Sequence, residues 1–567
     1  MANITGSRIT RMYSNFRGVD FRGEDINLAR SPDCLNVWKD YKHTESIRTR
    51  PGMEIVYDFP RIDFGHGEPA VNVHAIYFFR GKMLVHYDGE FSEITEGVAI
   101  PIAAVNDAPS NGFVYEDIFY FMDGQGYYKY DGIEFEPVVG YVPTTSIARK
   151  PEGGGKAHED VNMLSDFRFN TFLADGESTE FFLDTMSIDE DYQPEAWVNG
   201  EKTACTADFA KGKITFSTAP GKPLTDGQDN VRIKFKKNVP KYKPCITGCT
   251  LLQVFDNRVF ISGNKDYPNY VWHCSLDDPT YFSDLDYYRE GMDSAEIKGM
   301  VAGNNALWVF REPSDANTNV FYHTPTIDDD YGKIYPSAHS SVTTGCIGKA
   351  INFNDDIVFF SERGMEGVSG DITTEQVLEH RSSMVDGKLL AEPGYKNMLL
   401  EEWEGYLLVI IGNKVFLADS RAIFTKEDHV EYEWFYWELE KQITCTKVHN
   451  NVLYLGTTDG VYSLTDADSR VESYWVTPKD KFGYPNHQKT TNKRGCVAEA
   501  TGDISVYAKT EKTEFELIGD FENVTDFFVS RIKRKKFKDI QLKFYSNTRF
   551  SLESVTLECF IGGYIKR

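Results

Sequence analysis

One unit recurs along this chain: a short aromatic and apolar strand, a polar turn that contains Gly or Asn, and a second strand. Two copies end in a Tyr-Asp-Gly turn, where residues 75–79 lead to Tyr87-Asp88-Gly89 and residues 117–121 lead to Tyr130-Asp131-Gly132. Later copies begin near residues 257, 305, 356, 405 and 451. Repetition at this period is typical of a radial array of small antiparallel sheets, so the sequence predicts an all-β protein built on a β-propeller.

The length of 567 residues favours two to four domains. We expect an extended N-terminal arm over 1–55, a first part of the propeller over 56–150 and a second part over 246–475. At about 40–50 residues for each four-stranded blade, these two parts hold roughly six to seven blades. Helical periodicity is rare, and residues 373–380 have room for two helical turns.

Two further segments have a different pattern of strands and turns. A Gly-rich stretch at 153–155 precedes five short alternating strands, so we expect an inserted β-sandwich over 151–245. Strand-like runs near 504–508, 515–518, 540–545 and 555–561 indicate a C-terminal β-sandwich over 476–567.

The cysteines and the terminus indicate a protein made and folded in a cytoplasm. Nine Cys are an odd number in strand-like contexts, which favours buried reduced thiols. The N-terminus lacks the regions of a secretory signal, and no apolar run is long enough to predict a membrane segment. Cys245, Cys249, His273 and Cys274 match no standard zinc spacing, so we expect no metal site and no cofactor.

The net charge of −25 argues against a surface that grips nucleic acid. From residue 476 onward there are 17 basic and 12 acidic residues, which leaves −30 for the rest of the chain. The densest basic run could bind an acidic partner, or it could be a solvated edge strand whose charges deter aggregation. Its candidate partner-binding residues are Arg531, Lys533, Arg534, Lys535, Lys536 and Lys538.

Catalytic motifs are hard to find in the sequence. The Asp and Gly of the repeated turns suit tight hairpins, and no phosphate-cradling loop, Gly-x-Ser-x-Gly elbow or His-Glu-x-x-His pair occurs. We therefore expect no enzyme and no catalytic residues.

A propeller glycosidase is the third hypothesis, and the Ser-x-Asp-x-Gly-x-Thr-Trp boxes expected of sialidases are missing. The second hypothesis is a host-surface glycan-binding protein of a phage tail, in which Trp197 and Phe172 of the insert either stack on sugar rings or pack in a core.

Three stretches resemble the tail nozzle, or packaged-DNA stabilisation, proteins of tailed bacteriophages. They are 31–52 with Ser-Pro-Asp-Cys-Leu-Asn-Val and Arg-Thr-Arg-Pro-Gly, 263–282 with Pro268-Asn269-Tyr270-Val271-Trp272, and the ending 537–567.

The resemblance implies a structural virion protein that forms a homo-oligomeric, six-fold ring around the DNA exit channel. Such a ring would contact portal, adaptor and other tail proteins, retain the packaged genome and allow its ejection. It would be assembled in the host cytoplasm, and the family supplies no catalytic residues. DNA would pass without sequence-specific binding, which an acidic channel wall favours by repelling phosphate.

Overall fold

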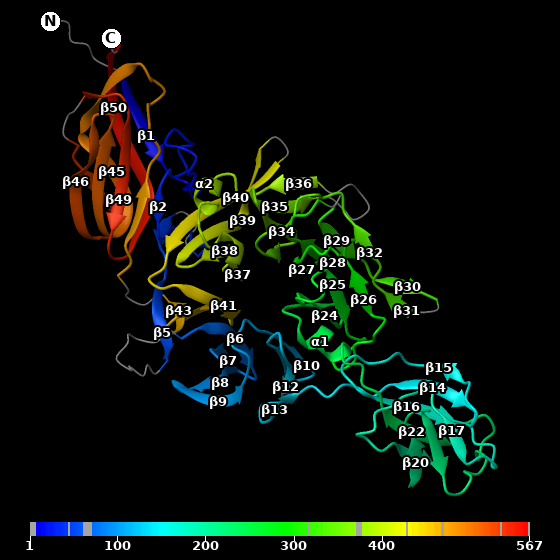
Figure 1. The fold of residues 1–567 in the computed structure, drawn as a ribbon. Helices are drawn as coiled ribbons and strands as arrows, with labels where there is room; N and C mark the ends of the chain where they lie inside the picture. Colours follow the sequence, from blue (N-terminus) through cyan, green and yellow to red (C-terminus); the bar gives the residue numbers. More distant parts are fainter. Residues whose placement is uncertain are drawn as a thin grey trace, which may run out of the picture.

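The computed structural model describes residues 7–564, except 43–45, 60–70, 316–317, 330–331, 370–376, 427–428, 466–469 and 533–535. Within these residues the chain is almost entirely β-structure (Figure 1). The helical segments found there are short: α1 (Tyr242–Thr247), α2 (Asp386–Leu389) and a 3-10 turn (Tyr395–Asn397). No helix in the described ranges is long and apolar enough to cross a membrane.

Seven four-stranded antiparallel sheets form the blades of a propeller, which confirms the predicted fold class. Five of the first six are meanders of consecutive strands, the fourth skips the hairpin β30–β31 before its last strand β32, and the seventh takes its fourth strand, β5, from the N-terminal region. In chain order the blades are β6–β9 (Val73–Phe79, Lys82–Tyr87, Glu90–Thr95, Val98–Ala104), β10–β13 (Asn111–Tyr115, Ile118–Met122, Tyr127–Tyr130, Phe135–Pro137), β23–β26 (Leu251–Phe255, Arg258–Ser262, Tyr270–His273, Tyr287–Arg289), β27–β29 with β32 (Ile297–Gly303, Ala306–Arg311, Val320–His323, Ser337–His339), β33–β36 (Ala350–Phe353, Asp356–Ser361, Gly364–Ser369, Val377–His380), β37–β40 (Leu399–Trp403, Tyr406–Ile411, Lys414–Lys426, His429–Glu438) and β41–β43 with β5 (Ile443–His449, Val452–Thr457, Gly460–Thr465, Gly52–Asp58). A small hairpin, β30–β31 (Thr326–Asp328, Gly332–Ile334), projects from the fourth blade.

The same kind of hairpin turn starts every blade. The first two strands are joined by two residues with positive φ, a combination that Asn, Asp and Gly tolerate and that gives the type I′ hairpin turn. The second strand is mostly apolar and buried, as in β28 and β38, because both of its faces are covered. The turn pairs are Arg80-Gly81, Glu116-Asp117, Asp256-Asn257, Asn304-Asn305, Asn354-Asp355, Glu404-Gly405 and Asn450-Asn451.

The ring of blades closes because a strand that precedes the first blade in the chain pairs with the last blade. Strand β5 pairs antiparallel with β43, so that Tyr57 lies opposite Val461 and Gly52 lies opposite Thr465. The first strands β41 and β6 of the neighbouring blades are also in contact. β5 runs across the boundary expected at residue 55, and it completes the last blade rather than leading into the first.

The insert leaves the propeller between β13 and β23 and lies apart from the blades (Figure 1). One sheet has the order β15-β14-β16-β22-β18-β19, and the other has the order β17-β21-β20. The two sheets enclose a core that includes Phe172, Phe181, Ile214 and Phe235. Their strands are β14 (Thr144–Arg149), β15 (Lys156–Ala157), β16 (Phe167–Phe172), β17 (Glu180–Phe182), β18 (Glu195–Val198), β19 (Glu201–Thr203), β20 (Cys205–Asp208), β21 (Lys213–Phe216) and β22 (Val231–Lys236).

The C-terminal part is an eleven-stranded sheet that also takes in the N-terminal arm. Its long strands β46 (Thr513–Val524) and β50 (Phe550–Tyr564) each pair antiparallel with β45 (His487–Thr510). Arg8–Tyr13 (β1) pairs with β50, so the first and last described strands lie side by side (Figure 1). The arm therefore contributes paired strands to this sheet. The members are β1, β2 (Cys34–Leu35), β3 (Val37–Trp38), β4 (Ile47–Thr49), β44 (Ser473–Val476), β45 (His487–Thr510), β46 (Thr513–Val524), β47 (Phe527–Ser530), β48 (Lys536–Phe537), β49 (Ile540–Ser546) and β50 (Phe550–Tyr564).

A single buried cluster joins this sheet to the propeller. It contains Trp38 from the arm, Trp437 from the sixth blade and Phe544 from the C-terminal sheet. The Trp437 indole N–H donates to the carbonyl oxygen of Val37 at 3.1 Å, and Arg50, only 1% exposed, bonds Glu440 at 2.7 Å. The propeller and the C-terminal sheet thus share one core, whereas the insert has its own.

The expectation of a helix at 373–380 is wrong where the structure describes it. Residues 377–380 form β36, the outer strand of the fifth blade, and pair with β35 from Val377 opposite Ser369 to His380 opposite Glu366. Pairing with an existing sheet edge outweighs the weak helical preference of this stretch. Residues 373–376 lie outside the described residues.

Candidate ligand-binding site on the insert

The larger sheet of the insert has one face packed on the core and one face open. Strict alternation in β22 turns Val231, Ile233 and Phe235 inward, and leaves Arg232 and Lys234 on the open face. The register places Thr171, Arg232, Trp197 and Lys202 in one row across four strands. Neighbouring strands therefore bring aromatic and cationic side chains together on this face.

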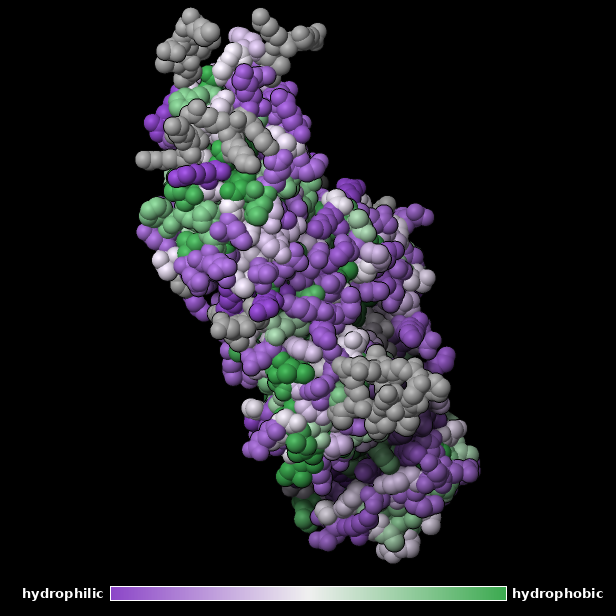
Figure 2. Space-filling view, turned by 90° about the vertical axis from the view of Figure 1, so that its left-hand side faces the viewer, coloured by the Kyte–Doolittle hydropathy of each residue, from purple (hydrophilic) through white to green (hydrophobic). Residues whose placement is uncertain are grey.

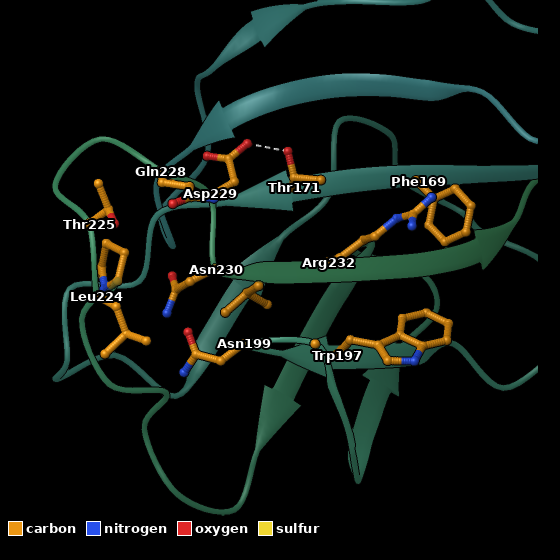
Figure 3. Close-up of a pocket in the computed structure, with 13 residues that line it drawn as sticks. Phe169, Thr171, Trp197, Asn199, Leu224, Thr225, Gln228, Asp229, Asn230 and Arg232 are labelled. Atoms are coloured by element: carbon orange, nitrogen blue, oxygen red, sulfur yellow. Dashed lines mark hydrogen bonds between the residues drawn. The ribbon is translucent and has the colours of Figure 1, made fainter.

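A cavity of about 530 Å³ lies between this face and the loop before β22. Figure 3 shows Trp197, Arg232 and Phe169 close together at one end, with polar and loop side chains at the other. The cavity is large enough for one or two sugar-sized rings. Its lining residues are Phe169, Thr171, Trp197, Asn199, Gly200, Pro223, Leu224, Thr225, Gln228, Asp229, Asn230, Val231 and Arg232.

Cations stack on the aromatic rings of this face. The Arg232 guanidinium carbon lies 3.5 Å from the centre of the Phe169 ring, and the Lys202 ammonium lies 5.9 Å from that of Trp197. The Phe169 and Trp197 rings are 6.2 Å apart. Such contacts hold a flexible cationic side chain in one orientation while its charged head stays in water.

Internal hydrogen bonds hold the pocket loop in place. Asp229 accepts hydrogen bonds from the Thr171 hydroxyl and from the backbone N–H of Ala148, the latter at 2.9 Å (Figure 3). Asn230 accepts from the N–H of Ala174 at 3.1 Å and donates to the carbonyl of Gly221 at 2.8 Å. These groups build the pocket, and the exposed amides of Asn199 and Gln228 face solvent on its rim.

The structure separates the two aromatic residues singled out in the sequence. Phe172 is fully buried in the core of the insert, so it cannot stack on a ligand, and that alternative is wrong for this residue. Trp197 is half-buried and lines the cavity. Sequence reasoning missed Phe169 and Arg232; the alternation of β22 marks Arg232 as outward-facing, but only the register shows which rings it meets.

The basic run lies elsewhere, at the edge of the C-terminal sheet. Arg531 and Lys536 are exposed, and Arg531 borders a small cavity of about 150 Å³ whose lining is largely apolar. Lys538 is exposed, and its backbone N–H donates to Glu511 at 2.8 Å. Lys533, Arg534 and Lys535 lie outside the described residues, so partner binding by this run stays a prediction.

The cysteines lie mainly in the core. All nine are free thiols; Cys205 is half-buried and the other eight are buried. Burial raises the pKa of Cys274 and of Cys346 to about 12, which keeps both thiols protonated at neutral pH. Cys245 and Cys249 donate to carbonyl oxygens of α1 and its flank, and His273 bonds the carbonyl of Cys274. Across the described residues, no group of three or more His, Cys, Asp or Glu is placed to hold a metal.

The fold and the cavity together define an all-β propeller protein with a ligand-sized pocket on an inserted sandwich. No family model matches the chain, and no curated protein matches it. Among solved structures, BamB from Moraxella catarrhalis is similar at a TM-score of 0.34 with 10% identity, over 73% of this chain and 96% of that one. The exo-beta-1,3-galactanase from Phanerochaete chrysosporium is similar at 0.19 with 8% identity, over 79% and 95%. These similarities carry no argument about activity.

Proposed function

We propose that this chain is a non-catalytic structural protein of a bacteriophage tail whose inserted sandwich binds a glycan on the host surface. The observation that supports binding is the open cavity beside Trp197. The flat indole face can pack on the apolar face of a sugar, and the amides of Asn199 and Gln228 can bond its hydroxyls. The tail assignment rests on the sequence resemblance alone.

A glycosidase is less well supported at this pocket. Hydrolysis of a glycosidic bond by the usual mechanism needs two carboxyl groups on either side of the bond. Asp229 is the one carboxylate among the described residues that line the cavity, and it is engaged by Thr171 and by the backbone of Ala148. Binding without cleavage is the chemistry that suits this residue set.

Glycan-array binding by the full chain tests the binding role. We expect selective binding to a subset of glycans and its loss in Trp197→Ala. Met186→Ala serves as the control, because this side chain of the insert is 71% exposed and does not line the cavity. A wild-type chain that binds no glycan, or a Trp197→Ala variant that binds as wild type does, would contradict glycan binding at this site.

The second candidate function is the nozzle ring around the DNA exit channel, with the genome retained and then released. The observation that favours it is the charge of −30 carried by the chain before residue 476, because a strongly acidic wall lets DNA slide without sticking. Light scattering of the purified chain, alone and with neighbouring tail proteins, tests this role. We expect a closed assembly of about six copies; a chain that stays monomeric under both conditions argues against the ring.

A further inference from the structure

We infer that the glycan bound at this pocket is acidic, and that Arg232 recognises a carboxylate on the sugar that stacks against Trp197. This inference rests on the proposed glycan binding and names the class of ligand. Arg232 and Trp197 are directly opposite each other in the register of β22 and β18. Side chains at such positions stand about 5 Å apart at their Cβ atoms, so both can contact one ligand.

Some cations of this sheet form salt bridges, whereas no salt bridge among the described residues holds Arg232 or its strand neighbour Lys234. Lys202 bonds Glu195 at 2.5 Å, and Lys236 bonds Asp191 at 2.5 Å. The hydrogen bond from Lys202 lowers the pKa of Glu195, so that pair is charged at neutral pH. Within the described part of the chain, by contrast, no acidic side chain pairs with Arg232. An exposed guanidinium with no acidic partner, in a chain with a net charge of −25, is available to bind an acidic group of a ligand.

The geometry of Arg232 suits this task. The carbon of its guanidinium lies 3.5 Å from the centre of the Phe169 ring, and this cation–π contact restrains where the N–H groups point. A fixed guanidinium can donate two parallel hydrogen bonds to a carboxylate, whereas a lysine in its place would act as a point charge. Phe169 is therefore a positioning residue for Arg232.

The test compares full-length wild-type protein with Arg232→Gln, Arg232→Lys and a matched control, Lys211→Gln. Lys211 is an exposed cation of the insert outside the pocket, so its change removes the same charge from the same module. The probes are polygalacturonate as a polymer of uronic acid, dextran as a neutral polymer, and poly-dT as a single-stranded nucleic acid. Affinity electrophoresis at several salt concentrations measures binding, and thermal melts verify that each variant is folded.

We expect wild type to bind polygalacturonate more tightly than dextran, with affinity that falls as salt rises. Arg232→Gln should weaken this binding on the order of tenfold, Arg232→Lys should weaken it less, and Lys211→Gln should leave it unchanged. Trp197→Ala should abolish it.

Three outcomes overturn the inference. If only dextran is bound, and Arg232→Gln binds it as wild type does, the glycan site stands and the acidic ligand is wrong. If neither polymer is bound and the glycan array is also negative, the proposed glycan binding fails together with its acidic ligand. Tighter binding of poly-dT than of polygalacturonate would assign the aromatic and cationic face to nucleic acid instead.

Discussion

Two aromatic residues of the insert, close in the sequence, have opposite roles. Phe172 is 0% exposed among core side chains, and Trp197 is half-buried at the cavity. Phe172→Ala should lower the free energy of unfolding of the insert by about 3–4 kcal/mol, because it leaves a cavity in a packed core. Trp197→Ala should cost about 1 kcal/mol, as expected near a surface. Urea denaturation of both variants measures the difference, and equal losses would contradict the assigned burial.

His380 gives the fifth blade a pH-dependent contact. Its ring lies 2.6 Å from an Asp386 oxygen and 3.4 Å from a Glu366 oxygen. Burial acts to lower the pKa of His380, but the hydrogen bonds with Asp386 and then Glu366 outweigh burial and raise this pKa to about 9. Because the unfolded value is about 6.5, the protonated form stabilises the fold fully below pH 6.5, and this stabilisation is lost as the pH rises through 9.

The contribution of His380 is on the order of 2 kcal/mol after allowance for its access to solvent. Urea denaturation at pH 6 and pH 9.5 should therefore show a larger loss of stability for wild type than for His380→Gln. An NMR titration of the His380 ring measures its pKa directly. A value at or below 6.5 would show that the two carboxylates do not hold the charged form.

At the scale of elements, the propeller depends on a strand from far away in the chain. Tyr57 of β5 is 7% exposed and packs in a cluster with Phe59, Val73 and Val461. Tyr57→Ala should lower the stability of the propeller by about 3 kcal/mol, since it loosens the strand that closes the ring. Ile55→Ala on the same strand is the control, because Ile55 is 48% exposed and should cost less than about 1 kcal/mol. The urea midpoints of the two variants should differ clearly; if they coincide, β5 does not pack as described.

The elements that sequence reasoning predicts are those specified locally. Asn, Asp and Gly at the hairpin turns and the apolar second strands repeat in every blade, so the propeller class is visible in the sequence. The pairing of β5 with β43 and of β1 with β50 is not visible, because no local pattern names a partner about 400 residues or more away. The same limit applies to the pocket: alternation exposes Arg232, and only the register places it beside Trp197 and Phe169.

At the scale of the whole molecule, the three parts are joined in two different ways. The propeller and the C-terminal sheet share a buried cluster, and the insert has a separate core. The ends of the insert lie close together, since Thr144 and Lys236 pair with Phe169 and Phe167 of the same strand. A module with adjacent ends can be added to a loop at small entropic cost. The face seen in Figure 2 is mainly hydrophilic, with apolar groups between the polar ones. Val98 and Ile100 of the outer strand β9 are among the exposed apolar side chains.

Calorimetry should therefore show two unfolding transitions. The insert should unfold by itself, while the propeller and the C-terminal sheet unfold together. A variant in which a short Gly-Ser linker replaces residues 144–236 should lose the first transition and lower the temperature of the second, because Met163 and Leu164 pack among propeller residues such as Trp272. Loss of both transitions in that variant would mean that the propeller needs the insert to fold.

The pairing of β5 with β43 also determines when the propeller can close during synthesis. β5 leaves the ribosome early, but its partner β43 ends only at Thr465. At 5–20 residues per second, the wait lasts about 20–80 s, during which β5 has a bare edge that could join another nascent chain. β1 waits longer still, for the last strand to be translated. The first strands of this protein therefore lack their native partners until the last strands are translated.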